Sequence, residues 1–149
     1  MKWAQAMAAV SICVLVAGLH AGDLRIALAE KDLGRRSKLA LDNAGSTLKA
    51  ARAALDKGEN EKLTADLAEV QESVDLAYDS LKSTGKDPRR NPKWFKPAEI
   101  QTRDLLRKVE SLQLDMNFQD RPMMDKLKAR LQQVHEDLLQ GLMEGKKKK

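Results

Sequence analysis

The sequence predicts an all-α protein, with two antiparallel helical hairpins packed as a four-helix bundle after an N-terminal signal peptide. About a third of its 149 residues are charged and only 3% are aromatic. That composition suits helices with one buried stripe and a solvated remainder. Apolar residues also recur at helical spacing in four segments, and one short apolar run lies near the amino terminus.

The amino terminus has the form of a signal peptide. Lys2 precedes an apolar run from Ala6 to Leu19, which is too short to cross a bilayer comfortably. Cleavage after Ala21 would remove residues 1–21, whereas cleavage after Ala29 would use the small-x-small sequence that ends there. We therefore expect export to the periplasm or the extracellular space. An uncleaved N-terminal anchor is the alternative.

Cysteine usage and charge narrow the class of protein further. Cys13 is the only cysteine and lies in the apolar run, so the processed chain has no disulfide or cysteine metal ligand. An exported chain without disulfides fits a bacterial envelope better than a eukaryotic extracellular fluid.

The excess of basic residues is concentrated in one internal stretch and in the C-terminal tail. A uniformly basic nucleic-acid-binding domain is therefore not indicated, and no specific nucleic acid is expected as a partner.

The first helical hairpin is expected over residues 30–83. Its apolar residues fall at steps of three and four, which place them along one face of each helix. Gly58 suits the left-handed backbone that ends many helices, and Asn60 is expected to cap the second helix. The two stripes are Leu41, Ala44, Leu48, Ala51 and Leu55, then Leu63, Leu67, Val70, Val74, Ala77 and Leu81.

The second hairpin is expected over residues 98–145, after a linker at residues 84–97. Pro97 suits the first position of a helix, and Asp120 is expected to cap the last helix. The stripes are Thr102, Leu105, Val109, Leu112 and Met116, widened by Ile100 and Leu106, then Met124, Leu127, Leu131, Val134, Leu138 and Leu142.

The two predicted hairpins are similar at a spacing of 61 residues. The matched apolar pairs are Leu39 and Ile100, Leu48 and Val109, Leu55 and Met116, and Leu81 and Leu142. A duplicated hairpin is one interpretation, and shared helical periodicity is the other. One hairpin alone cannot bury both of its stripes, so two hairpins are expected to pack together. The alternative is a homodimer in which each hairpin pairs with a second chain.

Cationic and aromatic side chains are interleaved in the linker. This pattern suits contact with an envelope or secreted protein, or with an anionic polymer. The alternative is that the aromatic rings fold onto the end of the bundle, because a chain poor in aromatic residues usually buries them. The candidate partner-binding residues are Arg89, Arg90, Lys93, Trp94, Phe95 and Lys96.

A run of four lysines ends the chain. These residues follow Gly145 without an apolar partner, so we expect them to be disordered. They would attract an anionic lipid surface or polymer, or they would simply keep the chain soluble. The electrostatic tail consists of Lys146, Lys147, Lys148 and Lys149.

The sequence contains no recognisable catalytic constellation. His135-Glu136 resembles the start of a zinc-protease helix, but Leu139 stands where the second histidine is required. Asp66 and Glu69 lie among lysines and are expected on a solvated helix face. We therefore expect no enzyme, no metal and no cofactor.

The predicted function is that of a non-catalytic exported bacterial helical bundle acting through protein–protein contact. The alternative is a binder of anionic polymers or membrane surfaces.

Overall fold

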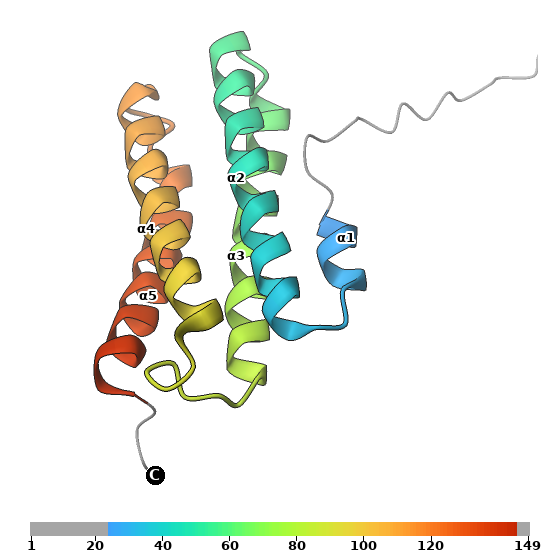
Figure 1. Ribbon diagram of the computed structural model, residues 1–149. Helices are drawn as coiled ribbons and strands as arrows, with labels where there is room; N and C mark the ends of the chain where they lie inside the picture. Colours follow the sequence, from blue (N-terminus) through green and yellow to red (C-terminus); the bar gives the residue numbers. More distant parts are fainter. Residues whose placement is uncertain (1–23, 146–149) are drawn as a thin grey trace, which may run out of the picture.

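The computed structural model describes residues 24–145, which are all-helical with no strand among them (Figure 1). Five helices pack against each other: α1 (Leu24–Ala29), α2 (Leu33–Lys57), α3 (Asn60–Ser83), α4 (Pro92–Asp115) and α5 (Pro122–Glu144). The predicted all-α class is confirmed. The predicted signal peptide at residues 1–21 and the lysine tail at residues 146–149 lie outside the described residues.

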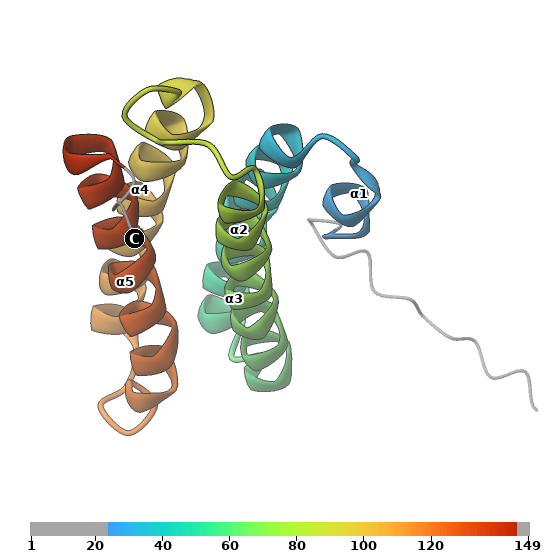
Figure 2. The same ribbon diagram turned by 90° about the horizontal axis from the view of Figure 1, so that it is seen from below.

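Two antiparallel hairpins lie side by side, α2 with α3 and α4 with α5 (Figures 1 and 2). Asp42 contacts Gln101 in the first half of α2 and α4, and Arg52 contacts Asp115 nearer their ends, so these two helices run parallel. Helix α3 packs beside α5 in the same way. Helix α1 lies on the other side of the first hairpin, away from the second (Figure 2).

Contacts between the hairpins join residues at nearly the same spacing as the 61-residue similarity in the sequence. The hydrogen bonds from Gln101 to Asp42 and from Tyr78 to Asp137 each join residues that are 59 positions apart. Residues at equivalent places in the two hairpins therefore lie at nearly the same height. The two similar halves of the sequence therefore fold as two hairpins that lie in the same orientation.

Small side chains bring α2 and α3 close together. These two helices make the most extensive contact in the described chain. Asn43 Nδ2 donates to Glu69 Oε1 at 3.0 Å and to Ser73 Oγ at 2.9 Å, which fixes the register of the pair. The small buried residues include Ser37, Ala40, Ala44, Ala51 and Ala54 on α2, and Ser73, Ala77 and Ser80 on α3.

The predicted apolar stripes supply most of the buried core. All but a few of their members are buried, and Leu55, Leu106 and Leu142 pack against the core while partly exposed. Ile100 differs, because 44% of its surface is exposed. Asp66 differs in the opposite sense. It is only 1% exposed, although a solvated surface was predicted for it, and Lys62 Nζ pairs with it at 2.6 Å.

The helix ends match the sequence in part. Gly58 ends α2 with φ 72°, as predicted. Asp32 caps α2 by accepting the backbone N–H of Arg35 at 2.8 Å, and this hydrogen bond lowers the pKa of the Asp32 carboxyl. The predicted caps Asn60 and Asp120 are wrong. Asn60 is the first residue of α3, and Asp120 precedes the capping position of α5.

Helix α4 begins at Pro92, earlier than the predicted start after Pro97. Both prolines suit the first position of a helix, because a missing N–H costs nothing there. The structure uses the first of them. The connection between the hairpins therefore shortens to residues 84–91, and Trp94 and Phe95 lie on the first turn of α4.

Candidate functional site

The six predicted contact residues divide into two groups. Phe95 is buried in the core at 5% exposure, and Trp94 is half-buried against it. The cations among them are exposed, namely Arg89, Arg90, Lys93 and Lys96. The aromatic rings thus hold the start of α4 onto the bundle, while the charges face solvent.

Trp94 packs directly against Gly34 of α2. A Cβ atom on Gly34 would lie 2.3 Å from Nε1 and 2.4 Å from Cε2 of the indole. No larger residue fits there without moving the ring. The Nζ atom of Lys93 lies 5.0 Å from the centroid of the same ring, within the range of a cation–π contact.

Cationic and apolar side chains share the exposed surface at the start of α4. A shallow depression of about 500 Å³ is lined by Pro92, Lys93, Lys96, Pro97, Ile100 and Gln101. The arginines Arg89 and Arg90 precede it, and neither forms a side-chain ion pair with another described residue. We call this area the basic–apolar surface; it consists of Arg89, Arg90, Pro92, Lys93, Lys96, Pro97 and Ile100.

The connection at residues 84–91 lies against the C-terminal end of α5. A Cβ atom on Gly141 would lie 3.1 Å from Cγ of Pro88, and one on Gly145 would lie 3.2 Å from the Asp87 carboxylate. The Cβ atom of Arg89 is 3.6 Å from that second position. The position from which the lysine tail departs therefore adjoins the basic–apolar surface, although the two are far apart in sequence.

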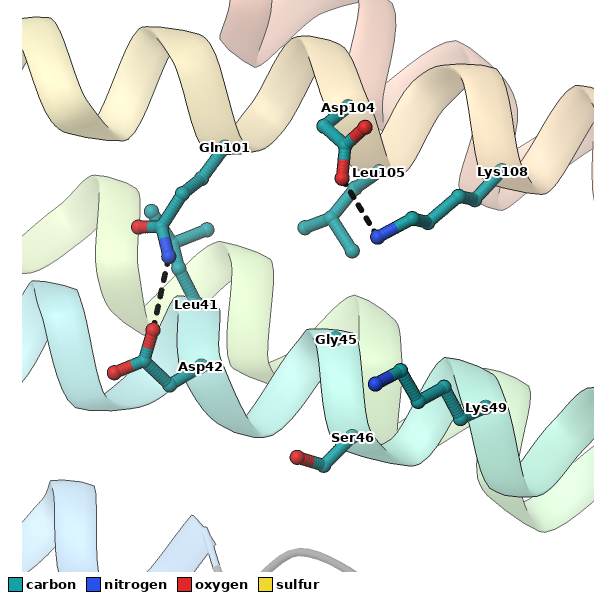
Figure 3. A pocket seen from close by; sticks show the side chains of 9 residues that line it. All are labelled: Leu41, Asp42, Gly45, Ser46, Lys49, Gln101, Asp104, Leu105 and Lys108. Carbon is teal, nitrogen blue, oxygen red and sulfur yellow. Dashed lines mark hydrogen bonds and ion pairs between the residues drawn. The ribbon is translucent and has the colours of Figure 1, made fainter.

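A groove runs between α2 and α4 (Figure 3). Its central part, of about 330 Å³, is lined by Leu41, Asp42, Gly45, Ser46, Lys49, Gln101, Asp104, Leu105 and Lys108. A cavity of about 200 Å³ continues it toward Trp94, and another of similar volume continues it toward Arg52. Gly45 leaves the α2 wall open, because a Cβ atom there would meet nothing within 4 Å.

The charges in this groove are unequally paired. Lys108 Nζ lies 2.6 Å from Asp104 Oδ2, and this hydrogen bond lowers the pKa of the Asp104 carboxyl (Figure 3). Asp42 is held by Lys38 Nζ at 2.6 Å and by Gln101 Nε2 at 2.9 Å. Lys49 forms no ion pair with any described residue.

Opposite charges collect on opposite faces of the two hairpins. Helix α2 carries six basic and two acidic residues, whereas α3 carries six acidic and two basic ones. Helix α4 carries five basic and four acidic residues, and α5 carries three basic and four acidic ones. Helices α2 and α4 share one side of the bundle and α3 and α5 the other (Figure 1). The first pair of helices therefore has a net positive charge and the second pair a net negative charge. The total charge of the chain conceals this division, which a count for each helix shows.

His135 and Glu99 form a polar contact between α5 and α4. His135 Nδ1 lies 3.4 Å from Glu99 Oε1, and the Nε atom of Arg103 lies 3.8 Å from the same oxygen. Glu99 is 7% exposed. Within residues 24–145, no group of three or more histidine, cysteine, aspartate or glutamate side chains is placed to hold a metal ion.

Comparison of the chain with protein-family models, curated proteins and solved structures finds no match. None of the helices within residues 24–145 is both long enough and apolar enough to cross a membrane.

Tyr78, the only tyrosine in the chain, joins the two hairpins. Its hydroxyl donates to Asp137 Oδ2 at 2.7 Å. Burial of the ring, and then this hydrogen bond, raise the pKa of Tyr78 to about 12 from an ordinary value of 10.0. Because the pKa is raised in the folded state, the contribution of the neutral Tyr78 hydroxyl to the stability of the fold is complete below pH 10. It is lost as the pH rises from about 10 through 12.

Replacement of Asp137 by asparagine is expected to lower the pKa of Tyr78 toward its ordinary value. The ultraviolet absorbance of tyrosinate measures this pKa directly, because no other tyrosine contributes, and circular dichroism shows at which pH the helices persist. Glu136→Gln removes a neighbouring charge that makes no hydrogen bond to Tyr78, so it serves as the control. An unchanged midpoint in Asp137→Asn would show that the Tyr78–Asp137 contact is not formed in solution.

Proposed function

We propose that the chain is a non-catalytic, exported bacterial protein that binds a protein partner through its basic–apolar surface. After removal of the signal peptide, its two hairpins form a four-helix bundle that presents this surface. One observation carries the proposal. Exposed Ile100 and two prolines line a depression of about 500 Å³ together with Lys93 and Lys96.

The chemistry of this surface indicates the kind of partner. Covering the apolar area with another apolar surface lowers the free energy of the complex. The flanking cations favour acidic groups at the rim of the contact. A partner segment with apolar side chains and nearby carboxylates satisfies both requirements. A soluble polyanion would satisfy only the cations and would leave Ile100 in water.

Export is supported by the signal-like amino terminus, and the position of α1 bears on where the chain is cut. Cleavage after Ala29 would remove α1, whereas cleavage after Ala21 would keep it. Ala27 is 1% exposed, so α1 belongs to the packed structure. We therefore favour Ala21 as the last residue removed, and the N-terminal sequence of the secreted protein would identify the cut.

A photo-crosslinking residue placed at Lys96 tests the proposal in intact cells. The matched control carries the same residue at Lys126, which is exposed on α5. We expect one discrete adduct with another protein from position 96 and none from position 126. Lys93→Glu introduced together with the crosslinker at 96 should abolish the adduct. Identical adducts from the two positions, or none from position 96, would contradict the proposal.

A second candidate function is binding to an anionic polymer or membrane surface. It is favoured by the place of Gly145, which lies beside Arg89 and is the residue before the lysine tail in the sequence. Cations of the connection between the hairpins and of the C-terminal tail would then act together, with an affinity that falls steeply as salt rises. Loss of binding to anionic vesicles on deletion of residues 146–149, with the adduct at position 96 absent, would favour this function over the first.

A further inference from the structure

We infer that the protein assembles with further copies of itself, the acidic α3 of one copy docking along the basic groove between α2 and α4 of the next. This contact goes beyond the proposed function, because it uses residues outside the basic–apolar surface. Each copy carries both halves of the contact, on opposite faces (Figures 1 and 2).

The groove offers a positive charge that its own acidic residues do not neutralise. Asp42 is occupied by Lys38, and Asp104 is occupied by Lys108, each at 2.6 Å. Lys49 lies in the centre of the groove, opposite Lys108, and forms no ion pair with a described residue (Figure 3). An acidic segment that enters here finds a free ammonium group and two others that can share their carboxylates.

The opposite face offers a matching row of carboxylates on α3. Glu61, Glu72 and Asp79 are exposed, and none of them forms an ion pair with a described residue. Their spacings are close to three turns and two turns of helix, so they lie along one side of α3. Ala65 and Ala68 are exposed between them. Such short side chains permit close approach of another helix.

The two rows also match in spacing. Lys38 and Lys49 on α2 are separated by the same number of residues as Glu61 and Glu72 on α3, a rise of about 17 Å along either helix. Helix α3 runs antiparallel to α2 and α4 within one chain. A copy displaced without rotation would therefore lay its α3 antiparallel to both groove helices, which the helix dipoles favour.

The contact joins two different faces and is therefore heterologous. A heterologous contact that does not close into a ring continues from copy to copy. Assembly should then grow with protein concentration instead of stopping at a dimer. It should weaken as salt rises, because the charges involved are exposed and screened over about 8 Å at physiological ionic strength.

Light scattering on the secreted protein, over a range of protein and salt concentrations, measures this assembly. We expect the average mass at low salt to rise beyond that of a dimer, and to return to that of a monomer at high salt. Lys49→Glu with Lys108→Glu, and separately Glu72→Lys with Asp79→Lys, should each weaken self-association at least about tenfold. Mixing the two variants restores opposite charges across the contact and should restore assembly.

Arg89→Glu with Arg90→Glu is the matched control. It reverses two charges on the basic–apolar surface and should leave self-association unchanged, which separates this inference from the proposed function. A wild-type protein that stays monomeric at low salt would overturn the inference. So would equal weakening by the control, a mass that stops at the dimer, or a mixture of the two reversed variants that stays monomeric.

Discussion

Replacing Phe95 with alanine is expected to lower the free energy of unfolding by about 3–5 kcal/mol. The ring of Phe95 is 5% exposed and belongs to the buried core, at the first turn of α4. Its removal would lose the burial of the ring and leave a cavity in the core. Urea unfolding followed by circular dichroism measures the change.

Lys96→Ala is the matched control for this substitution, because Lys96 is the next residue and is exposed. Its effect should stay within about 0.5 kcal/mol. Equal, small effects of the two substitutions would mean that Phe95 does not pack in the core. The comparison also separates loss of fold from loss of partner binding, since the proposed contact uses Lys96 but not Phe95.

Replacing Gly34 with alanine is expected to destabilise the protein by about 1–3 kcal/mol, the usual cost of overpacking. The added Cβ atom would lie 2.3 Å from Nε1 of Trp94, so the indole would have to move. A bulky planar ring that is half-buried cannot swing aside freely. Thermal unfolding measures the loss of stability.

Two further variants identify the cause of that loss. In a Trp94→Ala background the ring is absent, so Gly34→Ala should cost much less. Gly45→Ala, on the same helix, should stabilise the protein by as much as about 1 kcal/mol, because its Cβ atom would meet nothing within 4 Å. If Gly34→Ala costs as much without Trp94 as with it, the contact between the two residues is not the reason.

The sequence predicts the features of this fold that depend on local order. Helical periodicity identifies the apolar stripes, and a glycine such as Gly58 ends a helix wherever the backbone must turn left-handed. These two signals suffice for the all-α class and for the pairing of neighbouring helices. They extend over a few turns of helix and need no knowledge of the rest of the chain.

Features that depend on contacts between distant segments could not be predicted in this way. Whether Trp94 faces solvent depends on Gly34, which lies in another helix. Asp66 looks like a surface residue among lysines in the sequence, but the packing of the helices leaves it only 1% exposed. Charge on single helices is visible in the sequence, but its division between two faces requires that α2 lies beside α4.

The parallel stacking of the hairpins has a consequence for the order of folding. Contacts within each hairpin close a short turn, whereas the polar contacts between the hairpins join residues 55 to 63 positions apart. Loops of the second kind are slower to close, because they lose more chain entropy before any contact forms. The close α2–α3 pair can therefore form before the second hairpin has folded. It then offers a finished surface onto which the second hairpin folds.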